Sequence, residues 1–197
     1  MDIEKTVRSL KERHFKVSHF STGKEATEYL KGEISGTTVG IGGSKTVDQL
    51  GLYDQLSESN TVYWHWKCSD ADVREKANAA AVYLTSANAI SEDGQILNID
   101  GTGNRLAAQV YGNKRVFIIA GTNKICPDFD SALFRARNVA AVQNCKRFEG
   151  KKTPCKTDGK CHDCRTLDRI CNALLVLWAP MGGMTTEVVL IDEELGM

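Results

Sequence analysis

The sequence is poor in several features that mark whole classes of proteins. It has only 3 prolines in 197 residues, and its 25 Lys and Arg residues are balanced by 25 Asp and Glu residues. It contains no run of about 18 apolar residues, the length that a membrane-spanning helix requires. A general nucleic-acid binder needs a surplus or a stripe of basic residues, and the zero net charge argues against one. We therefore expect neither a membrane nor a nucleic acid as a partner.

The first residues also lack the apolar core of a signal peptide. The segment MDIEKTVRSLKERHF (1–15) is charged and amphipathic, so it predicts a cytoplasmic protein. Structural disulfides are rare in the reducing cytoplasm. The 7 cysteines are therefore expected to bind metal or to take part in catalysis where they cluster.

Apolar strand-like segments alternate with segments of helical periodicity along the chain. This order predicts an α/β protein with a mostly parallel sheet that is covered on both faces. Thr22, with Glu25 three residues later, predicts a capped helix over 24–31. The last two apolar segments, 174–180 and 187–195, are expected to form an antiparallel hairpin at the sheet edge. We expect one domain over 1–197, with a cysteine-rich excursion at 145–171.

Two glycine turns are candidates for a ligand site. GIGGS (40–44) and DGTGNR (100–105) each lead from a strand-like segment into a helix. Ligands of open α/β sheets bind at the carboxyl ends of the strands, where helix N-termini favour anions. The alternative is that both are ordinary tight turns. The predicted ligand-binding residues are Gly42, Gly43, Ser44, Thr46, Asp100, Gly101, Gly103, Asn104 and Arg105.

A weak catalytic candidate lies between these turns. Glu92 belongs to the turn SEDGQ (91–95) and follows a predicted strand, where a carboxylate can exchange protons or accept an acyl group. Paired acids before a glycine are more often only part of a turn. The catalytic residues are therefore otherwise unknown.

Four cysteines fall within residues 155–171, in the segment TPCKTDGKCHDCRTLDRIC. Four thiolates can hold a zinc ion or an iron–sulfur cluster, so we predict a metal site made by Cys155, Cys161, Cys164 and Cys171. The spacing matches neither a zinc ribbon nor a ferredoxin, and a redox dithiol or free thiols remain alternatives. The single cysteines, Cys68, Cys126 and Cys145, are expected to be buried small apolar residues.

Several of these segments resemble a known family. GIGGSKTVDQLGL, DGTGNR and TPC…GKCHDC…DRIC are similar to segments of the LUD (lactate-utilisation) domain family. Gly42, Gly43, Ser44 and Thr46 match its GGSxT turn, and Glu92 matches a family turn only loosely. The resemblance implies a Rossmann-like three-layer fold of the NagB/RpiA/CoA-transferase-like kind. It also implies a role beside iron–sulfur proteins in lactate oxidation.

The leading functional prediction is a protein of lactate-type or redox metabolism that binds a small anion and carries an iron–sulfur cluster or zinc. Electron-transfer proteins would be its partners, and it could be a subunit of an oxidoreductase system. A transferase or ligase acting on a CoA thioester or phosphorylated substrate is one alternative, and a redox sensor or adaptor is another. Trp64 and Trp66, if exposed beside a free sheet edge, would favour a homodimer.

Overall fold

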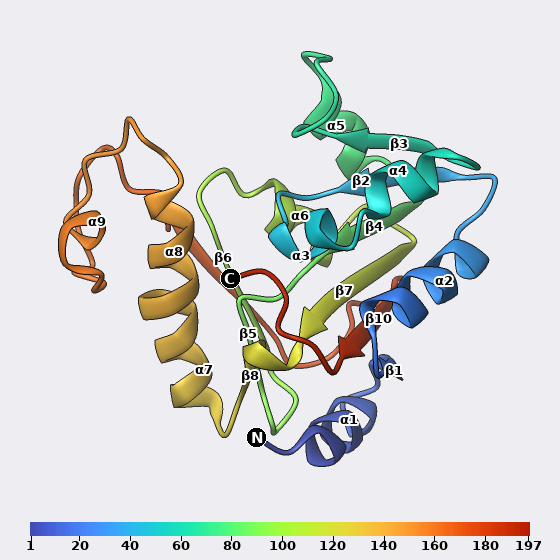
Figure 1. The fold of residues 1–197 in the computed structure, drawn as a ribbon, viewed down its shortest axis with the longest axis horizontal. Helices are drawn as coiled ribbons and strands as arrows, with labels where there is room; N and C mark the ends of the chain where they lie inside the picture. The colour runs from blue at the N-terminus through green and yellow to red at the C-terminus, as the bar shows by residue number, and fades with distance from the viewer.

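A computed structural model describes residues 1–197, and a six-stranded sheet forms its centre (Figure 1). Every neighbouring pair of strands in this sheet is parallel. The strand order is β1-β10-β7-β4-β2-β3. The strands are β1 (Lys16–Phe20), β2 (Thr38–Ile41), β3 (Thr61–Trp64), β4 (Val82–Thr85), β7 (Arg115–Gly121) and β10 (Thr185–Ile191). The predicted mostly parallel α/β sheet is confirmed.

Both faces of this sheet are covered, which gives three layers. In β7, Phe117 and Ile119 pack into one apolar cluster with Leu30 of α2 (Gly23–Glu33) and Leu56 of α4 (Leu52–Ser57). The alternate residues of β7, such as Ile118, pack on the other face, because successive side chains of a strand point in opposite directions. That second cluster takes in α1 (Ile3–Glu12), α5 (Val73–Asn78) and α6 (Asn104–Val110).

The predicted helix cap at Thr22 is present. The Thr22 hydroxyl accepts a hydrogen bond from the Glu25 amide at 3.2 Å, and the Glu25 carboxylate accepts one from the Thr22 amide at 3.2 Å. This reciprocal pair satisfies two amides that would otherwise lack a partner at the first turn of α2. The observed helix begins at Gly23 and ends at Glu33, a little longer than predicted.

A smaller second sheet contradicts the predicted C-terminal hairpin. Its order is β8-β5-β6-β9, with β5 (Ala89–Ser91), β6 (Ile96–Asp100), β8 (Ile125–Cys126) and β9 (Ala173–Leu177). β9 pairs antiparallel with β6, whereas β10 lies inside the main sheet between β1 and β7. The hairpin prediction is wrong because each of the two segments finds a better partner from a distant part of the chain. The apolar stretch 80–90 is likewise divided, with β4 in the main sheet and β5 in the smaller one.

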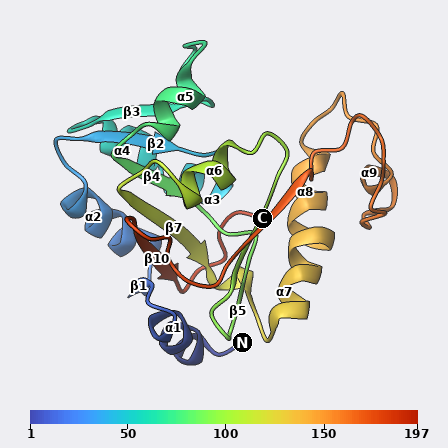
Figure 2. The same cartoon turned by 180° about the vertical axis from the view of Figure 1, so that it is seen from behind.

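A long helix stands beside the two sheets and leads into the cysteine-rich segment (Figures 1 and 2). It consists of α7 (Phe129–Arg135), a π-helical stretch η2 (Ala136–Ala140) and α8 (Ala141–Lys146). The segment that follows contains only the short helix α9 (Cys155–Asp158) before β9. No helix in the protein is both long enough and apolar enough to span a membrane.

Candidate functional site

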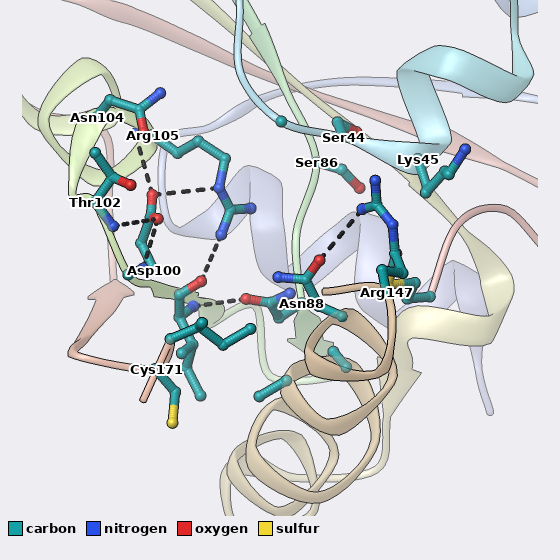
Figure 3. Close-up of a pocket in the computed structure, with 18 of the residues that line it drawn as sticks. Ser44, Lys45, Ser86, Asn88, Asp100, Thr102, Asn104, Arg105, Arg147 and Cys171 are labelled. Carbon is teal, nitrogen blue, oxygen red and sulfur yellow. Dashed lines mark hydrogen bonds and ion pairs between the residues drawn. The ribbon is translucent and has the colours of Figure 1, made fainter. Parts of the chain in front are cut away.

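A cavity of about 430 Å³ opens at the carboxyl ends of the main-sheet strands, against α8 (Figure 3). Both predicted glycine turns contribute to its wall: Gly43 and Ser44 from the first, and Asp100, Gly101, Asn104 and Arg105 from the second. Gly42, Thr46 and Gly103 do not line it. The wall is completed by Arg147 and its neighbours on α8, by Trp66 and by Lys124. Two turns almost sixty residues apart in the chain thus face one space.

The first turn leads from β2 into the short helix α3 (Lys45–Gln49). Ser44 caps this helix by accepting a hydrogen bond from the Val47 amide at 3.2 Å. A Cβ atom at Gly42 would lie 2.8 Å from the Tyr83 hydroxyl and 2.8 Å from the Arg105 side chain. Glycine at position 42 therefore lets the arginine of the second turn pass close to the first.

The second turn is organised by the carboxylate of Asp100, which is only 9% exposed. It accepts hydrogen bonds from the amides of Gly101 at 2.7 Å, Thr102 at 3.2 Å and Arg105 at 3.2 Å. It also pairs with the Arg105 Nε at 3.3 Å. Gly103 has a φ of 90°, which a residue with a side chain adopts only with strain. The turn therefore holds Arg105 at the cavity in a fixed orientation (Figure 3).

A residue that the sequence analysis did not single out is buried in this wall. Lys124 ends the short 3-10 helix η1 (Thr122–Lys124) after β7 and is 3% exposed. Its Nζ donates hydrogen bonds to the Thr46 hydroxyl at 2.8 Å and the Ser86 hydroxyl at 2.7 Å. Burial, with the positive charges of Arg135 and Arg105, lowers the pKa of Lys124 to about 7. Its position shortly after the apolar strand β7 is a signal in the sequence that could have identified it as a site residue.

The cavity wall carries a marked excess of positive charge. Five cationic side chains line it, and Asp100 is its one acidic side chain; the five are Lys45, Arg74, Arg105, Lys124 and Arg147. Lys45 and Arg105 each pair with an aspartate, whereas the other three make no ion pair. Such a wall favours the binding of a small anion in the cavity.

Trp66 forms part of the same wall. The guanidinium carbon of Arg147 lies 4.6 Å from the centroid of the Trp66 ring, and the Lys45 Nζ lies 5.7 Å from it. On its other side, Trp66 stacks on Trp64 with centroids 5.2 Å apart. Trp64 is only 1% exposed, so the pair is not an exposed surface for a second copy of the chain. The homodimer stays a prediction without that support.

Glu92 lies away from this cavity. Its carboxylate accepts a hydrogen bond from the Asp2 amide at 2.7 Å and lies 3.7 Å from the Lys5 Nζ. These contacts hold the beginning of α1 against the end of β5. A structural role for Glu92 accounts for all of them.

The cysteines of the 155–171 segment line a second, much smaller cavity, of about 20 Å³. The four predicted ligands are joined there by Cys145 of α8, which is buried as expected. The Thr153 hydroxyl contacts the Cys145 sulfur at 3.0 Å and the Cys155 sulfur at 3.2 Å. We call these five residues the thiol cluster: Cys145, Cys155, Cys161, Cys164 and Cys171.

Two members of the thiol cluster, Cys155 and Cys171, lie in surroundings that disfavour the thiolate. Burial raises the pKa of Cys155 and of Cys171, and neighbouring cysteines raise both further. In this structure no three His, Cys, Asp or Glu side chains are arranged to hold a metal ion. The predicted ligands therefore share one cavity wall without forming a ligand set. Cys171 also lines the larger cavity, so the two cavities are neighbours.

Comparisons with known proteins agree with the fold. A family model described as the LUD domain matches residues 3–191. A solved structure, described as a DUF162 family protein from Deinococcus radiodurans, is similar over 96% of this chain and 95% of that chain. Its TM-score is 0.55 at 11% sequence identity, so it supports the fold alone. No curated protein matches the chain.

Proposed function

Since this chain belongs to the LUD-domain family, we propose that it binds a small carboxylate or phosphate compound in the 430 Å³ cavity and acts in lactate-type organic-acid metabolism. The family name motivates the metabolic role. The cavity geometry supports the anionic ligand. The two parts of the proposal can be tested separately.

The observation that carries the anionic ligand is the charge of the cavity wall. Arg74, Lys124 and Arg147 line it without a carboxylate partner, and an anion between them would supply the missing charge. Hydrogen bonds to charged groups contribute about 1.5–3 kcal/mol each when they are well formed. Three such contacts would together supply about 4.5–9 kcal/mol, which corresponds to a dissociation constant between about 1 mM and 1 μM for a small ligand.

Thermal-shift and calorimetric titrations can test this ligand class. We expect lactate, pyruvate, inorganic phosphate or a sugar phosphate to raise the melting temperature, since a ligand that binds only the folded state stabilises it. Arg147→Gln should weaken the binding about tenfold, which corresponds to ~1.4 kcal/mol. The Arg147 guanidinium lies over Trp66 and donates a hydrogen bond to the Asn144 side chain at 3.2 Å, so a neutral amide is the partner that an anion would have to replace.

Arg8→Gln is the matched control, because Arg8 is exposed on α1 and lies outside the cavity wall. It should leave the affinity unchanged. If both substitutions weakened anion binding equally, the affinity would depend only on the net charge of the protein and not on the cavity wall. A shift with CoA and none with the smaller anions would favour the transferase or ligase function.

A second proposed function uses the thiol cluster as a site for an iron–sulfur cluster or zinc. The support is the donor set, because five cysteines line one cavity of about 20 Å³ and thiolates are the preferred ligands of these metals. The side chains would have to turn inward, since they do not form a ligand set as placed. When bound, an iron–sulfur cluster would supply electron transfer and zinc would hold the segment together.

Anaerobic purification followed by iron, sulfide and zinc analysis tests the thiol cluster. We expect close to one metal site per chain, and Cys164→Ser should remove most of the bound metal. Cys68→Ser is the control, since Cys68 contacts the Tyr53 hydroxyl at 3.6 Å and belongs to another part of the fold. Metal-free protein with all thiols open to titration would reject the metal site and leave the sensor or adaptor function.

A further inference from the structure

Lys124 is unusual among the charged residues of this protein because it is buried without an opposite charge. Both of its hydrogen-bond acceptors are neutral hydroxyls, those of Thr46 and Ser86. The charged groups that act on the Lys124 amine are Arg135 and Arg105. Both are positive and repel an ammonium group. A buried ammonium without a carboxylate is costly, so such a group gives up its proton readily.

Lys124 also belongs to the wall of the cavity in which the ligand would lie. Lys124 lines the 430 Å³ cavity together with Ser86 and Arg105. A neutral lysine amine is a nucleophile towards carbonyl carbon, and desolvation is one of the ways in which proteins activate it. The cationic wall would hold an anionic group of the same ligand molecule.

We propose that Lys124 forms an imine with a small ketone or aldehyde that carries a carboxylate or phosphate group. This inference rests on the proposed anion site and names the chemistry of its ligand. The structural basis is the buried Nζ, flanked by two hydroxyls and by no carboxylate, in the wall of a cationic cavity.

The reaction needs no oxidant, reductant or cofactor. The Lys124 nitrogen attacks the carbonyl carbon, a C–N bond forms, and the carbonyl oxygen is protonated to give a carbinolamine. The C–O bond then breaks and one water molecule leaves, carrying the oxygen and both amine hydrogens, so that a C=N bond remains. The Thr46 and Ser86 hydroxyls, which already contact the nitrogen, are placed to pass protons between nitrogen and oxygen.

Reductive trapping tests this proposal directly. The full-length protein is incubated at pH 7 with pyruvate or dihydroxyacetone phosphate and sodium cyanoborohydride, which reduces an imine to a stable amine. Intact mass and peptide mapping then locate the adduct. At pH 7 about half of an amine of pKa 7 is neutral, against about one in three thousand for an exposed lysine. We expect one adduct per chain, at Lys124, at least about tenfold above any other lysine.

The charged probes have uncharged counterparts, acetone for pyruvate and dihydroxyacetone for its phosphate. If the cationic wall selects the ligand, each uncharged compound should label Lys124 at least about tenfold less than its partner. The comparison of the two charged probes shows whether the carboxylate or the phosphate is preferred. Equal labelling by charged and uncharged compounds would overturn the anionic class.

Lys124→Arg keeps the positive charge but cannot form an imine, so it should give no adduct with any of the probes. Peptide mapping of the unaltered protein gives the same answer should this variant fail to fold. Calorimetric binding without a Lys124 adduct would overturn the imine and leave the anion site standing. Absence of binding by every charged probe would instead overturn the anion site itself.

Discussion

Asp100→Ala is expected to lower the free energy of unfolding by about 3 kcal/mol and to abolish anion binding, as the loss of one partner from a buried ion pair does elsewhere. The carboxylate holds three amides of its own turn and the Arg105 guanidinium at once. Without it, Arg105 would remain mostly buried with no opposite charge. Urea denaturation gives the stability, and calorimetry with the best anion gives the affinity.

The control for this experiment is Asp93→Ala. Asp93 also belongs to a turn and pairs with a cation, the Lys5 Nζ at 2.9 Å, but its side chain is 50% exposed. An exposed ion pair contributes little, so we expect a loss below about 1 kcal/mol and unchanged anion binding. Similar losses for the two variants would show that Asp100 does not organise the cavity wall.

Gly40→Ala should destabilise the fold by about 3 kcal/mol, at the upper end of what overpacked interiors cost. A Cβ atom at position 40 would lie 2.1 Å from the Ala77 carbonyl oxygen and 2.7 Å from its carbon. These are backbone atoms of α5, so the helix would have to move away from the main sheet. Thermal and urea unfolding measure the change.

Gly32→Ala is the opposite case and serves as the control. Gly32 lies within α2, and nothing lies within 4 Å of the place where its Cβ would stand. Alanine has the higher helix propensity and should stabilise the protein by up to about 1 kcal/mol. Both substitutions change the unfolded chain in the same way, so the difference between them arises in the folded state, from the contact with Ala77 at position 40 and from helix propensity at position 32. Equal effects would contradict this account.

Local patterns in the sequence predicted most of the main sheet. The alternation of apolar segments and helices indicated parallel strands, and Thr22 with Glu25 marked a helix end that the structure confirms. Both are properties of neighbouring residues. The C-terminal hairpin was wrong because closeness in the chain does not decide pairing: β9 joins β6, more than seventy residues earlier.

The candidate site was predictable only in part, for a related reason. The 40–46 and 100–105 turns carry recognisable glycines. The first follows β2 of the main sheet and the second follows β6 of the smaller sheet, so the rule for parallel strands of a single sheet did not by itself bring them together. Lys124 carries no motif. Its burial and its lack of a carboxylate partner arise from Thr46 and Ser86, which are distant in sequence. Cys145 was set apart from the other thiols because it belongs to α8 and precedes the cysteine-rich segment in the chain.

Residues 170 and 171 form a partition shared by the two cavities, since Ile170 and Cys171 appear in the walls of both. The Ile170 carbonyl also approaches Gly101 so closely that a Cβ there would lie 2.6 Å from it. If a ligand in either cavity displaces this partition, binding in the smaller cavity and binding in the larger cavity are thermodynamically linked. This linkage is reciprocal: binding in the smaller cavity changes the affinity of the larger one by the same factor by which binding in the larger cavity changes the affinity of the smaller one.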